Sequence, residues 1–553
     1  MNFSFRPRLF DALTDYSRAR FLNDVSAGLT VGVVALPLAM AFAIAAGVAP
    51  QAGIYTAIIA GFLIAALGGS RVQIGGPAGA FIVVLYGILQ KYGLANLLIA
   101  GMMAGVLLFA MGLFRIGNLI RFIPVAVVTG FTNGIAVLIV LSQLRDFLGL
   151  DIANMPADFF DSLTALFEHL GSADWQTLTI ACVSLLTVIF WPKTYLEHSQ
   201  RWLHYASRIP GTIVALVLAT GFVALTDFNV ATIGSRFGSI PQGLPAFELP
   251  TFTWSLAKQL VAPTITIALL CAIESLLCAR VADNMIDERH DPNQELMAQG
   301  VANFVTPFFG GIPATGTIAR TVTNIRSGAT SPIAGIVHSL TLLLILLVAA
   351  PLAAYVPLAT LAAILMFIAY NMGEWRAFPR LRQFTAPYRI VLISTFLLTV
   401  IFDLTVAVEV GMVLSSLFFI YRISDLTRLE KMHLPAGTPE GVEGYRIFGS
   451  LFFGAVSKLE VLLDPKRQPP KVMIFQMHQL ISLDTTGLET LEVICKNLRK
   501  QGAVLILCDL NKQPRSIIRR SGFLEALGPE NLTDSLEHAL ARARQLLAEP
   551  KVE

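Results

Sequence analysis

Apolar segments long enough to approach the width of a bilayer recur along most of this chain, and they constrain its fold more than any other feature. About fourteen of them lie between residues 25 and 421, separated mostly by short polar loops. Of the 553 residues, 55% are hydrophobic and only 14% are charged, which is too apolar for a soluble protein. The sequence therefore predicts a polytopic, all-α membrane domain over residues 25–424.

The predicted spans fall into two sets of seven, and several are shorter than the roughly 20 residues of a straight crossing. An odd number of spans per set means that the two sets enter the membrane from opposite sides, as in an inverted repeat. We place these repeats at about 25–226 and 263–424. The spans are 25–48, 53–67, 77–90, 94–114, 122–141, 175–191 and 209–225, then 263–282, 296–309, 315–326, 332–350, 357–370, 388–402 and 406–421.

Lys and Arg residues are distributed unevenly over the loops. If residues 1–24 are cytoplasmic, most of the basic residues, among them Arg71, Arg280 and Arg289, fall on the same side of the membrane. Basic residues concentrate in cytoplasmic loops of membrane proteins. We therefore expect a multi-pass protein with both termini in the cytoplasm.

Two of the short spans begin with stretches that contain glycine and proline, residues 75–80 and 311–317. Proline suits the first turn of a helix, so Pro77 and Pro313 predict two half-helices that begin here. Helix starts carry free N–H groups and the positive end of the helix dipole. Paired interrupted segments in the two halves also indicate the substrate site of a secondary transporter. We predict an anion site at mid-membrane; the alternative is two kinks that only help helices to pack.

Charged residues are rare inside the predicted spans. Glu274 lies in the apolar segment 269–276, where an ionised carboxylate costs at least ~2.5 kcal/mol on insertion scales. It is either a proton- or cation-coupling group, because burial and a nearby anion both favour the protonated form, or a neutral carboxyl that bonds a neighbouring helix. Arg320 either attracts anions, neutralises Glu274 or extends towards the cytoplasmic surface.

Other side chains near the two stretches are weaker candidates. Thr315, Thr317 and Thr321 offer hydroxyls, although threonines in membrane helices more often bond their own backbone. Phe42 and Phe81 either line the pocket or fill the core. Several polar side chains are expected to join helices: Gln51, Gln73, Tyr55, Asn133, Gln143 and Asn324.

After residue 421 the composition becomes that of a soluble α/β domain, which we place at 442–553. The pattern predicts an edge-type strand at 444–453, buried strands at 471–476 and 503–510, and helices at 488–502 and from 533 onward. Asp484 is expected to cap the helix that follows it. The net charge of +3 gives no indication of nucleic-acid binding. We predict no enzymatic chemistry, metal site or cofactor, because the sequence contains no phosphate-binding loop, metal-ligand spacing or activated nucleophile.

Seven short motifs together resemble bacterial members of the sulfate permease family over essentially the full length of the chain. The tail, with its motif at 484–487, is similar to the STAS domain (sulfate transporter and anti-sigma-factor antagonist). The motifs are VALPLAMA at 34–41, GSR at 69–71, IGGPAGA at 74–80, AIESL at 272–276, PFFGG at 307–311, TGTIART at 315–321 and DTTG at 484–487.

This resemblance implies a fourteen-helix, seven-plus-seven inverted fold like that of the uracil transporters. It implies that spans one to four and eight to eleven form a core that moves against a gate in an elevator-like motion, and that the protein is a homodimer in the bacterial inner membrane. The anion site of the family falls here on Ala78, Gly79, Ala80, Thr315, Gly316 and Thr317.

Two departures from common family patterns affect this expectation. Pro77 is followed by Ala78 and Gly79 instead of Thr or Ser, so backbone N–H donors must contribute more to the site. Sodium-coupled bicarbonate members have aspartate where Glu274 stands, so the chain is more similar to proton-coupled members that carry sulfate or dicarboxylates. In soluble relatives of the STAS domain, the hydroxyl residue at the position of Thr486 is phosphorylated, but membrane STAS domains do not require this.

The sequence therefore predicts a proton-coupled symporter of sulfate or a small dicarboxylate, in which Arg320, Phe42 and Phe81 join the anion site and Glu274 handles the proton. The cytoplasmic domain would support dimerisation or regulation through a protein partner. Alternatives are sodium-coupled bicarbonate transport, an uncoupled anion channel or exchanger, and a membrane sensor that signals through the tail.

Overall fold

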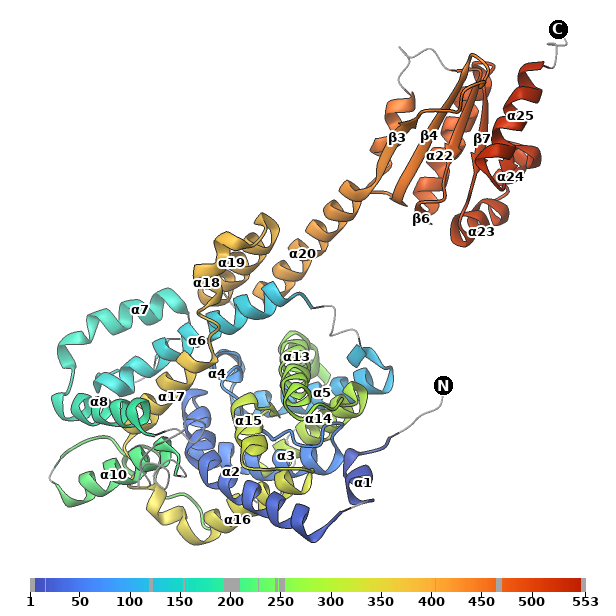
Figure 1. Cartoon of the computed structure of the whole chain (residues 1–553). Helices are drawn as coiled ribbons and strands as arrows, with labels where there is room; N and C mark the ends of the chain where they lie inside the picture. The colour runs from blue at the N-terminus through green and yellow to red at the C-terminus, as the bar shows by residue number, and fades with distance from the viewer. Residues whose placement is uncertain are drawn as a thin grey trace. The chain divides into compact units, whose positions relative to one another are not determined.

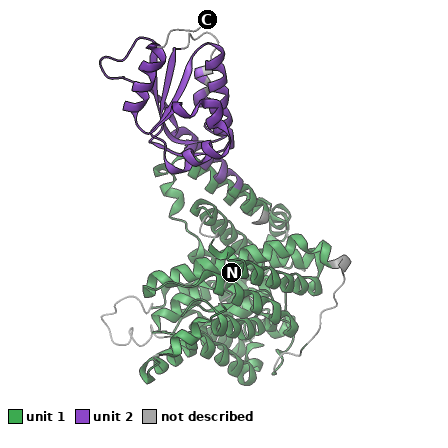
Figure 2. Ribbon diagram, turned by 90° about the vertical axis from the view of Figure 1, so that its right-hand side faces the viewer, with its two compact units in different colours: residues 1–412 green, residues 413–553 purple. Residues whose placement is uncertain are grey.

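The computed structural model describes residues 5–14, 16–118, 123–152, 155–156, 158–192, 209–226, 228–243, 247, 254–402, 404–463 and 470–548. The first residue of the predicted span 122–141 and part of the predicted loop after residue 225 lie outside these ranges. The chain forms two compact units, residues 1–412 and 413–553, which are coloured separately in Figure 2. The first unit is helical, and the second combines a β-sheet with helices, which confirms the predicted fold class.

Each predicted membrane span coincides with a helix of the structure (Figure 1). In the first half these are α2 (Arg18–Ala45), α3 (Pro50–Leu67), α4 (Phe81–Tyr92), α5 (Leu94–Leu113), α6 (Val125–Leu148), α8 (Trp175–Phe190) and α10 (Gly211–Leu225). In the second half they are α13 (Val261–Ile286), α14 (Pro292–Val305), α15 (Ile318–Arg326), α16 (Ile333–Ala353), α17 (Leu358–Met372), α19 (Ala386–Ile401) and α20 (Leu404–Leu426). Within the described ranges, 8 helices are long and apolar enough to cross a membrane.

Short elements complete the helical unit. The loop predicted between α6 and α8 contains the helix α7 (Phe159–Glu168), and α6 itself continues beyond its predicted end at residue 141. The remaining short elements are α1 (Arg8–Leu13), α11 (Ile233–Phe237), α12 (Trp254–Gln259), α18 (Ala377–Arg380), β1 (Gly75–Gly76) and β2 (Thr315–Gly316).

Helix packing shows the relation between the two repeats. Helix α3 packs against α16 just as α5 packs against α14, and α2 packs against α16 just as α5 packs against α13. The pairs α6–α19 and α8–α17 are related in the same way. In each case, replacing both helices of one pair by the equivalent helices of the other repeat gives the second pair. The unit is therefore built from two structurally equivalent halves.

The helices separate into two groups. Helices α2, α3, α5, α13, α14 and α16 pack mainly on one another, whereas α6, α8, α10, α17 and α19 form a second packed group. Figure 1 shows α13 and α14 beside α5, with α8 and α10 beside α17. Contacts between the groups run from α2 to α6, α10 and α17, and from α4 to α6. We call these groups the core and the gate.

Small residues allow the closest core helices to approach. At the crossing of α5 and α14, a Cβ on Gly105 would lie 2.5 Å from the backbone nitrogen of Phe304, and one on Gly300 would lie 2.5 Å from that of Phe109. Real Cβ atoms do not tolerate such distances, so glycine is required on both sides of the crossing.

The second unit contains a mainly parallel sheet with the strand order β3-β4-β5-β7-β8, while β6 also pairs with β4. The strands are β3 (Arg428–Met432), β4 (Val442–Leu451), β5 (Val472–Gln476), β6 (Leu480–Leu483), β7 (Val504–Cys508) and β8 (Leu532–Thr533). The sequence placed an edge-type strand at 444–453, but β4 is interior and β3, which was not predicted, forms the edge. The alternating polar and apolar residues of β4 are typical of an edge strand. The strand that pairs with β4 on its outer side, β3, is itself largely exposed, so it leaves this pattern in place although β4 is interior.

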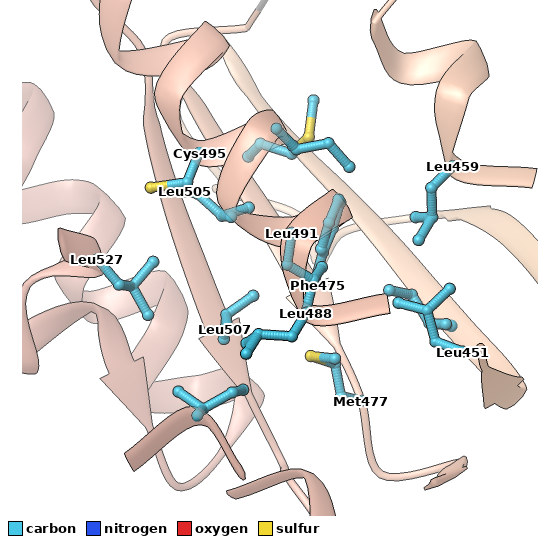
Figure 3. Close-up of a cluster of buried hydrophobic side chains, with 14 of the residues drawn as sticks. Leu451, Leu459, Phe475, Met477, Leu488, Leu491, Cys495, Leu505, Leu507 and Leu527 are labelled. Atoms are coloured by element: carbon cyan, nitrogen blue, oxygen red, sulfur yellow. The ribbon is translucent and has the colours of Figure 1, made fainter. Parts of the chain in front are cut away.

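The sheet is covered on both faces. Alternate residues of β5 and β7, such as Phe475 and Leu507, face the helix α22 (Thr485–Lys500), as Figure 3 shows. The intervening residues, such as Ile474 and Ile506, pack against α25 (Leu536–Ala548). The helices α23 (Lys512–Arg520) and α24 (Phe523–Leu527) complete the α22 side. The two central strands are therefore buried on both faces, as expected for a parallel sheet.

The motif at 484–487 is explained by local structure. Asp484 caps α22 by accepting a hydrogen bond from the backbone N–H of Gly487 at 2.8 Å, which confirms the predicted cap. A Cβ on Gly487 would lie 2.5 Å from the carbonyl oxygen of Leu451, so only glycine allows the helix to start this close to β4. In the same unit, burial raises the pKa of the Cys508 thiol to about 12, which keeps it in the unreactive thiol form.

Candidate anion site between two helix starts

The two stretches that contain glycine and proline lie side by side in the core. Strand β1 pairs with β2 in antiparallel orientation, with Gly75 opposite Gly316 and Gly76 opposite Thr315. Helix α4 begins shortly after β1, and helix α15 begins directly after β2. The structure therefore brings together two helix starts from the two repeats, as the sequence predicted.

The prolines have a different role from the one predicted. Pro77 and Pro313 do not occupy the first turn of a helix, because α4 begins at Phe81 and α15 begins at Ile318. Both prolines lie in the non-helical segments next to β1 and β2. The fixed φ of proline suits an extended chain as well as a first helical turn, and the sequence alone did not distinguish the two.

Side chains of α15 hold the segment that leads into β1. The carbonyl oxygen of Ile74 accepts hydrogen bonds from the backbone N–H of Thr317 at 2.8 Å and from its hydroxyl at 2.9 Å. The backbone N–H of Ile74 donates to the hydroxyl of Thr321, and Asn324 donates to the carbonyl of Val72. These bonds leave the backbone satisfied at a depth where water is excluded.

The segment that leads into β2 is held in a similar way by α3 and α14. The Thr56 hydroxyl accepts a hydrogen bond from the backbone N–H of Ile312 at 2.8 Å. Asn303 both accepts from the N–H of Ala314 and donates to its carbonyl, each at 2.8 Å. The Thr315 hydroxyl donates to the carbonyl of Cys271, which attaches β2 to α13. Both helix starts are thus held rigidly by the surrounding core.

The two helix starts lack side-chain caps. Neither Ala80, which precedes α4, nor Thr317, which precedes α15, supplies a side-chain hydrogen bond to the first turn. The hydroxyls of Thr315 and Thr317 donate to the carbonyl groups of Cys271 and Ile74, so they bond the backbone of other segments and not, as expected, their own. What an anion would meet here is therefore backbone N–H groups and the positive ends of two helix dipoles.

Arg320 lies beside these helix starts with its guanidinium buried and unpaired. Only 2% of the residue is exposed, and its three guanidinium nitrogens have no hydrogen-bond partner among the described residues. The Nη1 atom lies 2.5 Å from the position of a Cβ on Gly76, and the guanidinium carbon lies 5.9 Å from the ring centre of Phe42. No ion pair with Glu274 is formed in the described part of the chain, and its burial excludes an extended, solvated position.

Gly79 leaves room where the core meets the gate. A Cβ at this position would lie 3.5 Å from Phe42, 3.5 Å from Ile139 and 3.9 Å from the Met372 sulfur. Phe42 belongs to α2 of the core, whereas Ile139 and Met372 belong to α6 and α17 of the gate. The start of α4 therefore lies at the boundary between the two groups of helices.

Comparison with known proteins follows the same division of the chain. The profile of the sulfate permease family matches residues 21–395, and the STAS domain profile matches residues 434–539. The chain belongs to the sulfate permease family.

The chain is similar to two curated relatives and to one solved structure. The "Putative sulfate transporter YvdB" of Bacillus subtilis is 41% identical over 94% of this chain and 97% of its own length. The "Bicarbonate transporter BicA" of Picosynechococcus is 31% identical over 73% of this chain and 71% of its own length. The inward-facing murine anion transporter Slc26a9 is 19% identical, with a TM-score of 0.86 over 98% of this chain and 94% of that one, and therefore shares its fold.

The predicted site residues of the sulfate permease are mostly brought together. Ala78, Gly79 and Ala80 precede α4, and Thr315, Gly316 and Thr317 precede α15 on the paired strand. Arg320 and Phe42 lie beside them. Phe81 is 1% exposed and begins α4. These residues, together with Glu274, are treated below as the proposed site.

Glu274 projects from the middle of α13, the helix that binds β2. Its Oε2 atom is inaccessible to solvent and has no hydrogen-bond partner among the described residues. The residue one turn earlier on α13, Cys271, accepts the hydroxyl of Thr315. The carboxyl group is therefore carried by the same rigid body as the helix starts.

Sequence reasoning missed three fully buried acidic or histidine residues of the core, of which Asp24 on α2 accepts hydrogen bonds from the backbone N–H groups of Thr330 and Ser331. Glu295 on α14 and His338 on α16 are both 0% exposed. The rule that identified Glu274, an ionisable residue in a membrane span, applies equally to both. Glu295 escaped it because the predicted span began at residue 296, whereas α14 begins at Pro292 behind the cap Asp291.

A cavity of about 850 Å³ lies between the second half of α13 and the start of α6. Its walls include Ile273, Leu276 and Leu277 beside Glu274, and Arg280 and Arg289 on the side predicted to be cytoplasmic. None of the helix-start residues lines this cavity. Glu274 itself does not line the cavity either, so the cavity lies at the boundary of α13 and α6 and not at the predicted site.

Proposed function

We propose that this sulfate permease is a secondary active transporter of the bacterial inner membrane that imports a small dianion, sulfate or a dicarboxylate, together with a proton. The observation that carries the proposal is the buried, unpaired guanidinium of Arg320 beside two uncapped helix starts. Leaving a buried charge without a partner is costly, so such a group is retained where a ligand completes it.

The charges of the site fit this cargo. Arg320 contributes one positive charge, and each helix start contributes roughly half a charge. The total of roughly two positive charges balances a dianion. An ionised Glu274 on the same rigid body would cancel part of it, so protonation of Glu274 and binding of the anion favour each other. This coupling is the requirement for symport.

Transport through this site needs alternating access. The helix starts are held within the core by the hydrogen bonds of Thr56 and Asn303, while Gly79 borders α6 and α17 of the gate. We propose that the core slides against the gate in an elevator-like motion and carries the anion and Glu274 together. We propose further that two copies associate as a homodimer, and that the STAS domain supports this assembly or binds a cytoplasmic protein partner.

Uptake into proteoliposomes tests the proposal. The purified protein is reconstituted, a pH gradient with an acidic exterior is imposed, and labelled sulfate, fumarate and bicarbonate are compared. We expect uphill accumulation of sulfate or fumarate. Glu274→Gln should lower gradient-driven accumulation at least about tenfold, the factor that corresponds to about 1.4 kcal/mol, because the proton no longer enters the cycle. Glu168→Gln, at an exposed residue of α7, serves as the control and should behave as wild type.

The outcome also separates the alternatives. Full accumulation by Glu274→Gln would remove its role in coupling, and anion flux that never runs uphill would indicate a channel or exchanger. A protein that moves none of the anions, but whose signalling output requires residues 442–553, would be a sensor.

Sodium-coupled bicarbonate transport is the second candidate, since a relative with 31% identity is named a bicarbonate transporter. A sodium gradient at constant pH tests it in the same vesicles. Bicarbonate accumulation that needs sodium and ignores the pH gradient would favour this candidate over proton symport.

A further inference from the structure

His338 is a fully buried histidine in the apolar helix α16, and the function described so far does not use it. The residue is 0% exposed, and neither ring nitrogen has a hydrogen-bond partner among the described residues. A neutral imidazole carries one donor and one acceptor, and buried polar groups are nearly always bonded. An unpaired, buried imidazole therefore indicates a partner that comes and goes.

The neighbouring residue shows that the position itself does not prevent hydrogen bonding. The hydroxyl of Ser339 donates to the carbonyl of Gly335 at 3.2 Å and lies 3.5 Å from that of Ala57 on α3. Backbone acceptors are thus within reach at this helix interface. The ring nitrogens of His338 use none of these acceptors in the described structure.

The imidazole lies next to strand β1. A Cβ on Gly61 would be 3.5 Å from the ring carbon Cε1 of His338 and 3.2 Å from the carbonyl oxygen of Gly75. The adjacent residue of the strand, Gly76, has the guanidinium of Arg320 against it, with Nη1 2.5 Å from the position of its Cβ. His338 and Arg320 therefore lie near consecutive residues of one strand, Gly75 and Gly76.

The two groups are chemically complementary. A guanidinium has five N–H donors and no acceptor, and a neutral imidazole has one acceptor nitrogen. Both side chains are buried, and both lack a partner in the described structure. The guanidinium lies beside Gly76 and the imidazole lies near Gly75, so both groups reach the same two-residue strand.

We propose that His338 is a positioning residue for Arg320, whose guanidinium it binds through its acceptor nitrogen while the anion site is empty and releases when an anion arrives. The inference rests on the proposed function. In the loaded carrier, the anion binds the guanidinium of Arg320. The empty carrier must return across the membrane with this charge still buried. A buried guanidinium that is hydrogen-bonded costs less free energy than one without a partner. His338 therefore serves the return of the empty carrier.

This role makes a distinction that can be measured. Exchange of labelled external sulfate for unlabelled internal sulfate uses only the loaded carrier, whereas net uptake into sulfate-free vesicles needs the empty carrier to return. His338→Leu should leave exchange within about twofold of wild type and lower net uptake about tenfold, corresponding to about 1.4 kcal/mol on the return step. His338→Gln, which keeps an acceptor and a donor, should restore net uptake.

Two controls accompany the experiment. Ser339→Ala changes the next residue on α16 and should leave the ratio of exchange rate to net uptake rate at its wild-type value. Gel filtration of each variant shows whether it is folded before reconstitution.

Three results would overturn the inference. An equal reduction of both rates by His338→Leu is the result that a purely structural role requires. Unchanged rates in this variant are the result expected if Glu274 binds Arg320 in the empty carrier. Failure of His338→Gln to restore net uptake would count equally against it. A wild-type protein that neither exchanges nor accumulates sulfate, fumarate or bicarbonate contradicts the proposed function first, and the inference is lost with it.

Discussion

Glu295 and Arg320 are both buried charges without an ion pair in the described structure, but their surroundings differ. The Glu295 carboxylate accepts hydrogen bonds from the backbone N–H groups of Gly69 and Ser70 and from the side chains of Ser275 and Gln299. The guanidinium of Arg320 has none. Because the Glu295 carboxylate is fully bonded, we assign it to holding the fold, whereas we propose that the unpaired guanidinium of Arg320 binds a ligand.

Glu295→Gln tests the structural role. The variant amide would place its own NH₂ group against N–H donors that now bind a carboxylate oxygen. We therefore expect the free energy of unfolding to fall by about 3 kcal/mol, which lowers the melting temperature in detergent. Glu288→Gln is the matched control, because Glu288 forms an exposed ion pair with Arg71 and should contribute less than about 1 kcal/mol. Equal melting temperatures for the two variants would show that the Glu295 bonds do not stabilise the core.

At the residue scale, the sequence reveals charges but not their partners. Glu274 and Arg320 were found because an ionisable residue in an apolar segment is conspicuous. Thr315 and Thr317 bond carbonyl groups of other segments. These bonds depend on the pairing of β1 with β2, which no local sequence pattern encodes. His338 carried the same signal as Glu274, but the role that we propose for it depends on its position near β1, which the sequence does not reveal.

At the scale of elements, the crossing of α5 and α14 depends on one glycine from each helix. Gly300→Ala would place a Cβ 2.5 Å from the Phe109 nitrogen and 2.7 Å from the Gly105 carbonyl oxygen. Backbone atoms cannot move aside as a side-chain tip can, so we expect a loss of at least about 2 kcal/mol despite the better helix propensity of alanine. Fluorescence-detected thermal unfolding measures the effect.

Gly87 on α4 provides the control for this substitution, because a Cβ there would have no neighbour within 4 Å. Gly87→Ala should be neutral or slightly stabilising. If Gly300→Ala melts together with Gly87→Ala, the helices must adjust their separation more easily than close packing of backbones allows.

Elements were predictable where hydrophobic periodicity extends over many residues, as in α2 or α16. Short elements were not, because two residues of β1 or β2 carry no period and owe their conformation to each other. Strand β3 escaped for a related reason, since its exposed, charged residues lack an alternating apolar face.

At the scale of the whole molecule, every proposed transport residue belongs to the first unit. Deletion of residues 428–553 should therefore leave about half or more of the sulfate uptake per folded molecule, since a compact unit with its own core tends to keep its structure alone. Uptake by the truncated protein, normalised to its monodisperse fraction in gel filtration, is the measurement. Complete loss of uptake in a well-folded truncated protein would assign the STAS domain a direct part in transport.

The repeat architecture was the most predictable property of the molecule. Odd span numbers and interrupted segments in both halves indicated it, and the exchange-related pairs α3–α16 and α5–α14 confirm it. The assignment of helices to core and gate followed from the family resemblance and not from the residues, because apolar helices of either group have the same composition.

The pairing of β1 with β2 has a consequence for synthesis in the cell. Gly75 leaves the ribosome more than two hundred residues before its partner Gly316, an interval of roughly 10 to 50 s at ordinary translation rates. Throughout that interval the nascent first half holds unpaired backbone groups that hydrocarbon does not tolerate. Newly made chains must therefore keep this region in contact with water or with the insertion machinery until the second half arrives, and a stop codon between the halves should yield a fragment that is degraded.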